Sequence, residues 1–200
     1  MTKTNTCTID LEALGEKHHL ATIDIVENDR VVDTAWDWNT SDLQKILEEC
    51  KSHATGCDYV RLTGRVPNWL LSAIAFAVYP SVCSFQFGSN GEYHWTATPF
   101  PIDASVPTTL THFEVTETET EVYVNAVSEH MHADNIDITE DELFHIIMPP
   151  ISAGKLVYLS GITAIPISVS MALTYGDISR AIFQRPLSNP YYFCVLSHTP

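Results

Sequence analysis

Basic side chains are scarce in this 200-residue chain, which has ten Lys and Arg residues against 25 Asp and Glu residues. The formal net charge at pH 7 is therefore -15. Proteins that bind long nucleic acids rely on many Lys and Arg contacts to phosphates. The composition therefore argues against DNA or long RNA as a partner.

Signals for a membrane span and for disulfides are also lacking. No apolar run approaches the ~20 residues that a spanning helix needs, and the polar start MTKTNTCTID is unlike a signal peptide. The five cysteines are scattered and include no CxxC pair, so they predict neither a disulfide framework nor a zinc site. We expect free thiols, a cytoplasmic location and no membrane partner.

Acidic residues are depleted in two segments. Residues 59–91 contain Arg61 and Arg65 but no Asp or Glu, and residues 143–200 contain one acid, Asp177. Such segments could hold a small anion while the acidic remainder repels long nucleic acids. Burial in the core would produce the same depletion. The composition leaves both explanations open.

The chain does contain a clear strand–glycine–helix signal at residues 59–80. β-forming residues lead to Thr63-Gly64, where the strand should end. Pro67 suits the first turn of a helix, and apolar residues then recur at helical spacing. Such a turn offers free backbone N–H groups to an anion such as phosphate. The simpler alternative is a turn that binds nothing, with Trp69 in the core.

A second unit of this kind lies at residues 155–177, where a strand leads to Gly161 and another apolar helix. The recurrence predicts an α+β fold of two tandem β-β-α-β-α-β-β sandwich-like halves that form a pseudo-dimer. We place the first domain at residues 1–98, a proline-containing linker at 99–111, and a degenerate second domain at 112–200.

The expected elements follow from hydrophobic period and turn residues. In the first half we expect strands at 8–11, 19–26, 59–62, 82–87 and 93–98, helices at 42–49 and 67–78, and a charged turn at 15–17, with 31–36 extending or following the second strand. In the second half we expect strands at 112–115, 121–127, 155–159, 180–184 and 191–197, and helices at 139–147 and 166–174.

The run Leu62-Thr63-Gly64-Arg65-Val66-Pro67-Asn68-Trp69-Leu70 resembles the Gly-Arg-x-Pro-x-Trp-Leu signature of a small CRISPR-associated family of type III systems, the ring nucleases. The order of elements is similar over both halves, and so over most of the chain. In the second half, Gly161-Ile162-Thr163-Ala164-Ile165-Pro166 keeps the glycine and a displaced proline but lacks the arginine and the tryptophan.

The resemblance implies a binder of cyclic oligoadenylate, the second messenger of type III CRISPR antiviral defence, with cyclic tetra-adenylate as the expected form. Family members hold the ring at the interface of paired domains and cleave it by attack of a ribose 2′-hydroxyl on the neighbouring phosphate. Manganese assists in some members. The chain would then lower the level of the messenger, as a homo-oligomer or through its internal pseudo-dimer.

The family's catalytic groups are only partly present. Its histidine precedes a proline after the second helix, where this chain has Tyr79-Pro80 and Gly176-Asp177, and its aspartate is matched by Gln86 and Gln184. Its C-terminal Ser-His survives as Ser197-His198. The pair His130 and His132 lacks a third spaced ligand, so no metal ligand is assigned.

By resemblance, the candidate catalytic residues are His198, Arg65 and Arg185, with the alternative of a frayed chain end for His198. The candidate ligand-binding residues are Thr63, Gly64, Arg65, Val66, Pro67, Asn68, Trp69, Ser160, Gly161, Ile162, Thr163, Gln86, Gln184 and Ser197.

Three functions stay open from the sequence. The first is a ring nuclease with relocated catalytic groups, and the second is an inactive sponge that sequesters the cyclic nucleotide. The third is a pseudo-dimeric protein-interaction module. The residues themselves imply no cofactor, and manganese enters only through the resemblance.

Overall fold

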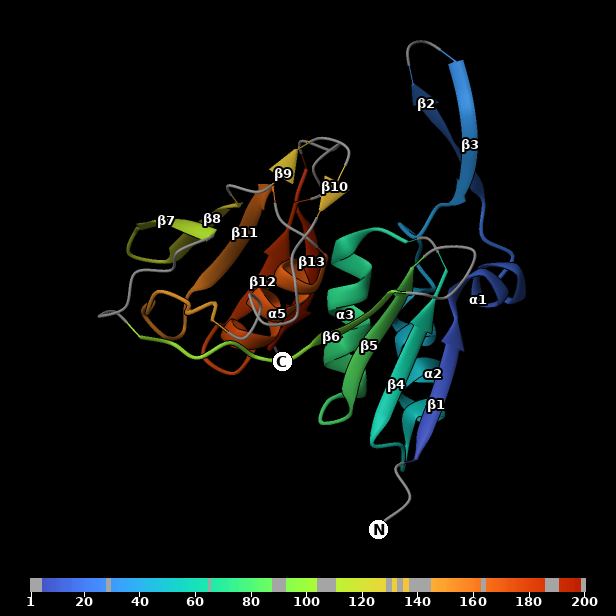
Figure 1. The fold of residues 1–200 in the computed structure, drawn as a ribbon, viewed down its shortest axis with the longest axis horizontal. Helices are drawn as coiled ribbons and strands as arrows, with labels where there is room; N and C mark the ends of the chain where they lie inside the picture. The colour runs from blue at the N-terminus through green and yellow to red at the C-terminus, as the bar shows by residue number, and fades with distance from the viewer. Residues whose placement is uncertain are drawn as a thin grey trace.

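The computed structural model describes residues 5–27, 30–64, 66–87, 93–103, 111–128, 131–132, 135–136, 145–162, 165–185 and 191–198, which form an α+β protein (Figure 1). Their strands make two mixed sheets and two antiparallel ribbons, and these residues include four helices. Within the described ranges, no helix combines the length and the apolar character that crossing a membrane requires.

The first sheet has four strands in the order β1-β4-β5-β6. These strands are β1 (Thr6–Asp10), β4 (Tyr59–Thr63), β5 (Val82–Phe87) and β6 (Tyr93–Ala97). β1, β4 and β5 are parallel, and β6 pairs antiparallel with β5. The connecting helices include α2 (Leu43–Ala54) and α3 (Asn68–Val78), close to the predicted positions.

Two features of the first half differ from the sequence-based expectation. The turn expected at 15–17 is wrong, because these residues end helix α1 (Leu11–Lys17). The Asp10 carboxylate caps this helix by accepting hydrogen bonds from the backbone N–H groups of Glu12 and Ala13, at 3.0 and 3.2 Å. In addition, β2 (Thr22–Glu27) and β3 (Arg30–Trp36) form a ribbon of their own instead of joining the sheet.

The second sheet has five strands in the order β13-β12-β11-β8-β7. They are β7 (Thr111–Glu117), β8 (Glu121–Ser128), β11 (Leu156–Ile162), β12 (Ala181–Gln184) and β13 (Phe193–Ser197). β8, β11 and β12 are parallel, and helix α5 (Ile165–Gly176) connects β11 to β12. A short ribbon pairs β9 (Met131–His132) with β10 (Asn135–Ile136). Most of the helix expected at 139–147 lies outside the described residues.

The two sheets share one connection pattern. In the first, the path β4–α3–β5–β6 runs from a central strand through a helix to a parallel strand and then to an antiparallel edge strand. The path β11–α5–β12–β13 does the same in the second. β1 and β8 occupy the corresponding place on the other side of the central strand.

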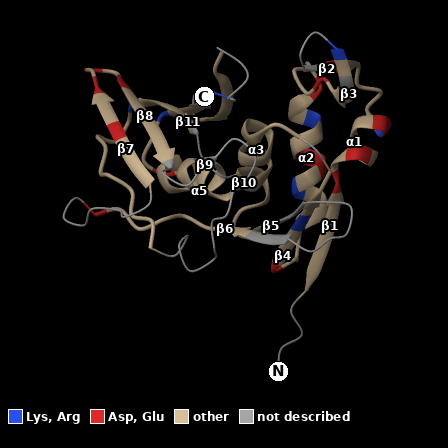
Figure 2. Cartoon of the chain, turned by 45° about the horizontal axis from the view of Figure 1, so that its top comes forward, with Lys and Arg blue, Asp and Glu red and all other residues tan. Residues whose placement is uncertain are grey.

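Helices α3 and α5 pack against each other between the two sheets (Figure 1). The contact is close, since a Cβ atom added to Gly176 would lie 2.2 Å from the ring of Phe76. Neither helix contains a charged residue, and both are uncoloured in Figure 2. Burial of these helices therefore explains much of the acid depletion in the two segments.

Candidate ligand-binding face

Alternation along the strands separates the residues of the second glycine turn onto two faces of the sheet. Leu159 on β11 and Gln184 on β12 are register partners and are both buried toward α5. Ser160 and Arg185, each one position later, therefore lie next to each other on the opposite, outer face. The backbone N–H of Arg185 donates to the carbonyl of Leu159 at 3.0 Å, which continues the pairing.

Ser160 and Arg185 belong to a row of polar side chains that crosses the outer face. Ser160 pairs in register with Asn125 on β8, and its hydroxyl donates to the Asn125 amide oxygen at 3.2 Å. The Asn125 amide nitrogen in turn donates to Glu114 of β7 at 3.1 Å. We call Glu114, Asn125, Ser160 and Arg185 the polar row. Its one cation, Arg185, is exposed.

A row of aromatic rings lies beside the polar row, two residues closer to the amino end of each strand. Tyr158 stacks between Tyr123, at 4.8 Å between ring centroids, and Phe183, at 5.0 Å. Tyr192 makes an edge contact with Tyr158 at 5.2 Å, with an angle of 82° between the rings. The Arg185 Cζ lies 5.8 Å from the centre of the Tyr192 ring. We call Tyr123, Tyr158 and Phe183 the aromatic row.

The outer face has opposite charge at its two ends. Glu121 accepts hydrogen bonds from the hydroxyls of Tyr123 at 2.9 Å and Tyr158 at 3.4 Å. The bond to Glu121 raises the pKa of Tyr123, and burial followed by the charge of Glu121 raises that of Tyr158, so both hydroxyls stay protonated at neutral pH. An anion is therefore repelled by Glu121 at the amino ends of the strands, whereas at the carboxyl ends Arg185 attracts it on one side of the polar row and Glu114 repels it on the other.

The first glycine turn also places two candidates side by side, since Thr63 and Gln86 are register partners. Arg65 and the side chain of Gln86 lie outside the described residues. Gly64 has a φ of +104°, and a Cβ there would lie 3.2 Å from the backbone nitrogen of Glu12. The half-buried residues Val66, Pro67 and Asn68 lead into α3, and Leu70 donates its N–H to the Pro67 carbonyl at 3.0 Å.

Trp69 and Gln184 join the two halves instead of facing solvent. Trp69 is 4% exposed and stacks on Phe193 of β13, with ring centroids 4.9 Å apart. Gln184 is 3% exposed. Its amide oxygen accepts from the Ser72 hydroxyl of α3 at 2.7 Å, and its amide nitrogen donates to the Ser168 carbonyl of α5 at 3.4 Å. The first turns of both helices thus meet at one buried side chain.

A cavity of about 10 Å³ lies beside the second glycine turn and is bordered by Ser160, Gly161, Ser168 and Gln184. That volume suits one water molecule at most. Gly161 has a φ of +126°, and a Cβ there would lie 1.8 Å from the Ala126 carbonyl oxygen, so the fold itself requires this glycine. Ile162 ends β11, and Thr163 lies outside the described residues.

Ser197 and His198 lie at the other end of β12, at the end of the neighbouring strand β13. The His198 Nε2 atom is 3.0 Å from the carbonyl oxygen of Gly176, at the C-terminus of α5. The backbone N–H of His198 donates to the Arg180 carbonyl. Arg180 precedes β12 whereas Arg185 follows it, so an extended strand separates them by roughly 16 Å. The structure therefore brings Ser160 and Arg185 together but does not bring His198 to them.

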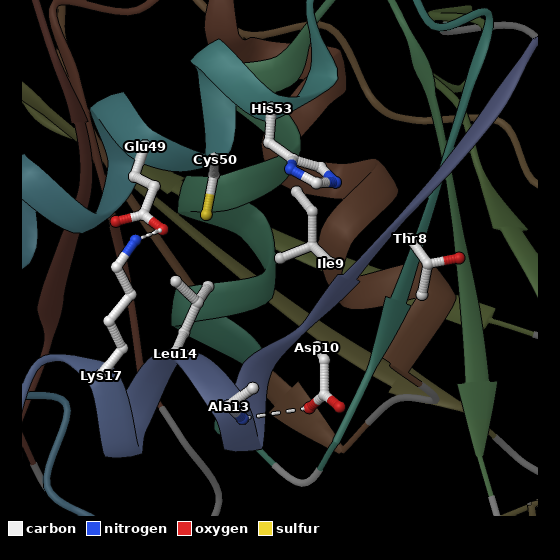
Figure 3. A pocket seen from close by; sticks show the side chains of 9 residues that line it. All are labelled: Thr8, Ile9, Asp10, Ala13, Leu14, Lys17, Glu49, Cys50 and His53. Carbon is white, nitrogen blue, oxygen red and sulfur yellow. Dashed lines mark hydrogen bonds and ion pairs between the residues drawn. The ribbon is translucent and has the colours of Figure 1, made fainter.

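Ser197 and His198 line a pocket of about 620 Å³ between the two halves. Its walls come from α2, α3, α5 and β13, with Lys51 and Asp177 among the charged lining residues. A smaller pocket of about 190 Å³ lies between β1, α1 and α2 (Figure 3). There the Lys17 ammonium bonds Glu49 at 2.5 Å and lowers the pKa of that carboxyl, so the two charges already compensate each other.

The described residues do not fit the manganese site that the family resemblance implies. A transition metal needs several imidazole or carboxylate ligands around one point. No group of three His, Cys, Asp or Glu side chains within the described ranges stands close enough to hold an ion. The polar row contributes one carboxylate, Glu114, which already accepts a hydrogen bond from Asn125.

Sequence reasoning missed the residues that surround Ser160 and Arg185, although the strands carry a signal for them. Tyr123-Val124-Asn125, Tyr158-Leu159-Ser160 and Phe183-Gln184-Arg185 share the pattern aromatic, buried, polar in three strands that pair in parallel. A period of two puts the first and third members of each triplet on one face. Aligning these triplets would have predicted both rows.

No family model matches this chain, and no curated protein and no solved structure matches it.

Proposed function

We propose that this chain binds a cyclic oligoadenylate, cyclic tetra-adenylate in the first instance, on the outer face of the second sheet and so lowers the level of the free messenger. The observation that carries the proposal is the register of β11 and β12, which puts Ser160 beside Arg185 on that face next to the aromatic row. A cytoplasmic binder of a small messenger of type III CRISPR defence would need these two kinds of contact.

The chemistry of the two rows suits a nucleotide. A guanidinium binds phosphate oxygens through two parallel hydrogen bonds, and the Ser160 hydroxyl adds a third donor when it turns from Asn125 to the ligand. Aromatic side chains bind bases by stacking. Asp177 is the one acid between residues 143 and 200, so few carboxylates of this segment oppose a phosphate.

The shared connection pattern supports the further proposal that the chain is a tandem duplication whose halves form a pseudo-dimer. When Gly64 is aligned with Gly161, Thr63 and its partner Gln86 correspond to Ser160 and Arg185, which is one position beyond the match of Gln86 with Gln184 that the resemblance implies. The helices lie between the sheets, so the two outer faces point away from each other (Figure 1). A ring held by two such faces would therefore join two chains, which favours a homo-oligomer in the bound state.

Sequestration fits the described residues better than cleavage. His198, the one family-like histidine, is placed at the opposite end of β12 from Arg185. A general acid or base must come within hydrogen-bond reach of the proton that it transfers. His198 of the same chain does not meet this requirement for a phosphate held at Arg185. Cleavage stays as the second candidate, since a neighbouring chain could supply the missing group.

Calorimetric titration with cyclic tetra-adenylate, followed by chromatography of the recovered nucleotide, tests the proposal. We expect saturable binding and recovery of intact ring. Linear products would replace sequestration by cleavage. Absence of binding by any cyclic oligoadenylate would overturn the proposal and favour the protein-interaction module.

A further inference from the structure

The ring of Tyr192 contacts the aromatic row through one of its faces. Tyr123 and Phe183 stack on the two faces of Tyr158, so both faces are occupied. Tyr158 can therefore meet Tyr192 through its edge alone, and the 82° angle between the rings means that this edge points at a face of Tyr192. The second face of Tyr192 is then directed away from the row.

The guanidinium of Arg185 lies over this ring. Its Cζ is 5.8 Å from the Tyr192 centroid, near the outer limit of a cation–π contact. The Arg185 side chain is exposed, whereas Tyr192 is half-buried and held by its contact with Tyr158. A fixed ring next to a movable cation offers a base and its phosphate two separate contacts.

The charges around the ring select an anionic partner and its orientation. Arg185 is the nearest cation at the carboxyl ends of the strands, and Glu121 lies at the amino ends. A phosphate is therefore drawn to Arg185 and repelled from Glu121. A nucleotide satisfies both requirements, since it joins a negatively charged phosphate to a flat base.

We propose that Tyr192 forms an adenine-stacking subsite whose phosphate is held by Arg185 and Ser160, an inference that rests on the proposed function. The base takes the place of the guanidinium over Tyr192, and the guanidinium turns to the phosphate at the end of the polar row. The same subsite accepts adenosine monophosphate as its minimal ligand.

Calorimetric titrations of the full chain with adenosine monophosphate, ribose 5-phosphate and cyclic tetra-adenylate test the subsite. Ribose 5-phosphate keeps the phosphate and lacks the base, so we expect it to bind about tenfold more weakly than the nucleotide. The Tyr192→Leu variant should remove this difference and weaken cyclic tetra-adenylate binding by about tenfold, because one stacked base is lost. Tyr192→Phe keeps the ring and should bind within about twofold of the wild type.

Tyr79→Leu is the matched control, since Tyr79 is 57% exposed and lines the pocket that holds His198. It should bind all three ligands as the wild type does. Circular dichroism checks that each variant is folded, and the wild-type comparison of the two phosphates does not depend on any variant.

The outcomes separate this inference from the proposed function. If cyclic tetra-adenylate binds and Tyr192→Leu binds it equally well, the stacking subsite is overturned and the proposed function stands. If adenosine monophosphate binds through Tyr192 but no cyclic oligoadenylate does, the subsite stands and the proposed function fails. If none of the three ligands binds, both are overturned.

Discussion

Gly161 shows how one residue can be required by the fold and also match a binding motif. Its φ of +126° is outside the range that other residues readily adopt, and its neighbour strand leaves no room for a side chain. The strand–glycine–helix pattern was therefore correctly predicted. The pattern alone does not distinguish a phosphate-binding turn from a glycine that lets two strand backbones approach closely.

Gly161→Ala should destabilise the protein by about 3 kcal/mol or more, because backbone strain adds to overlap with the Ala126 carbonyl. Gly154→Ala is the control, since Gly154 has a φ of +76° but no atom within 4 Å of the added Cβ. It should lose about 1 kcal/mol from strain alone. Urea denaturation measures both, and equal losses would contradict the steric argument.

The sequence offered a core position as the alternative for Trp69, but the role of Gln184 could not be read from it. Both stand in motifs that suggested ligand contacts, yet both are buried between the halves. The partner of Gln184 is Ser72, 112 positions away in the chain. Local spacing carries no information on a contact of that separation, because it depends on how the two sheets pack.

At the scale of elements, strands and helices with a strong hydrophobic period were predicted well. The core strand β4, helix α3, β8 and α5 all lie close to their expected bounds. Helix α1 was missed because it has seven residues and contains Gly15, so its period is too short to recognise. The Asp10 cap, confirmed by two hydrogen bonds, was the available signal.

The buried bond between Ser72 and Gln184 should couple the two halves energetically. Ser72→Ala leaves the Gln184 amide oxygen without its 2.7 Å partner and should cost about 1 to 3 kcal/mol. In a double-mutant cycle, Ser72→Ala and Gln184→Leu should show a coupling of about 1 kcal/mol or more.

Ser81→Ala serves as the control in this cycle. Its hydroxyl also donates at 2.7 Å, but to the Cys57 carbonyl within the first half. Its effect should add to that of Gln184→Leu without coupling. A coupling near zero for Ser72 would mean that the bond does not hold the halves together.

The Glu117 carboxylate ties the segment before β11 to the end of β7. It accepts from the Ser152 hydroxyl at 2.8 Å and N–H at 3.1 Å, and from the Lys155 ammonium at 3.1 Å. These bonds lower the pKa of Glu117 in the folded state, and the bond from the Ser152 hydroxyl has the largest effect. The stabilisation is therefore present above the unfolded pKa near 4.5 and is lost as the pH falls below it.

Glu117→Gln should accordingly destabilise the protein at pH 7 and have a smaller effect at pH 3. Glu119→Gln, in the turn after β7, is the matched control and should change stability little at either pH. Thermal unfolding at both values measures the difference. A loss for Glu117→Gln that is the same at pH 3 and pH 7 would contradict the pKa argument.

At the scale of the whole molecule, the halves should unfold together, because α3 and α5 bury one another between the sheets. All four tryptophans lie between residues 36 and 95, so tryptophan fluorescence follows the first half, whereas circular dichroism follows both. We expect the two signals to change at one urea concentration. An earlier transition in fluorescence would show that the halves are independent.

The strand order within each sheet and the packing of the two sheets could not be predicted from the sequence, and together they decide which surfaces a ligand can reach. Trp69 and Gln184, both candidates for ligand contacts, are buried by the packing of the two sheets. Among the described residues, the outer face with Arg185 and the pocket with His198 are two surfaces open to a ligand. These two surfaces lie at opposite ends of β12, so binding at each one is tested by a different substitution.

Parallel calorimetric titrations of Arg185→Gln and His198→Ala with cyclic tetra-adenylate, beside the wild type and Arg180→Gln, test the central claim most directly. Loss of a charged bond to phosphate should weaken binding by Arg185→Gln about tenfold or more, and His198→Ala and Arg180→Gln should bind like the wild type. Loss of binding by His198→Ala, with Arg185→Gln unaffected, would contradict a ligand on the outer face of the second sheet.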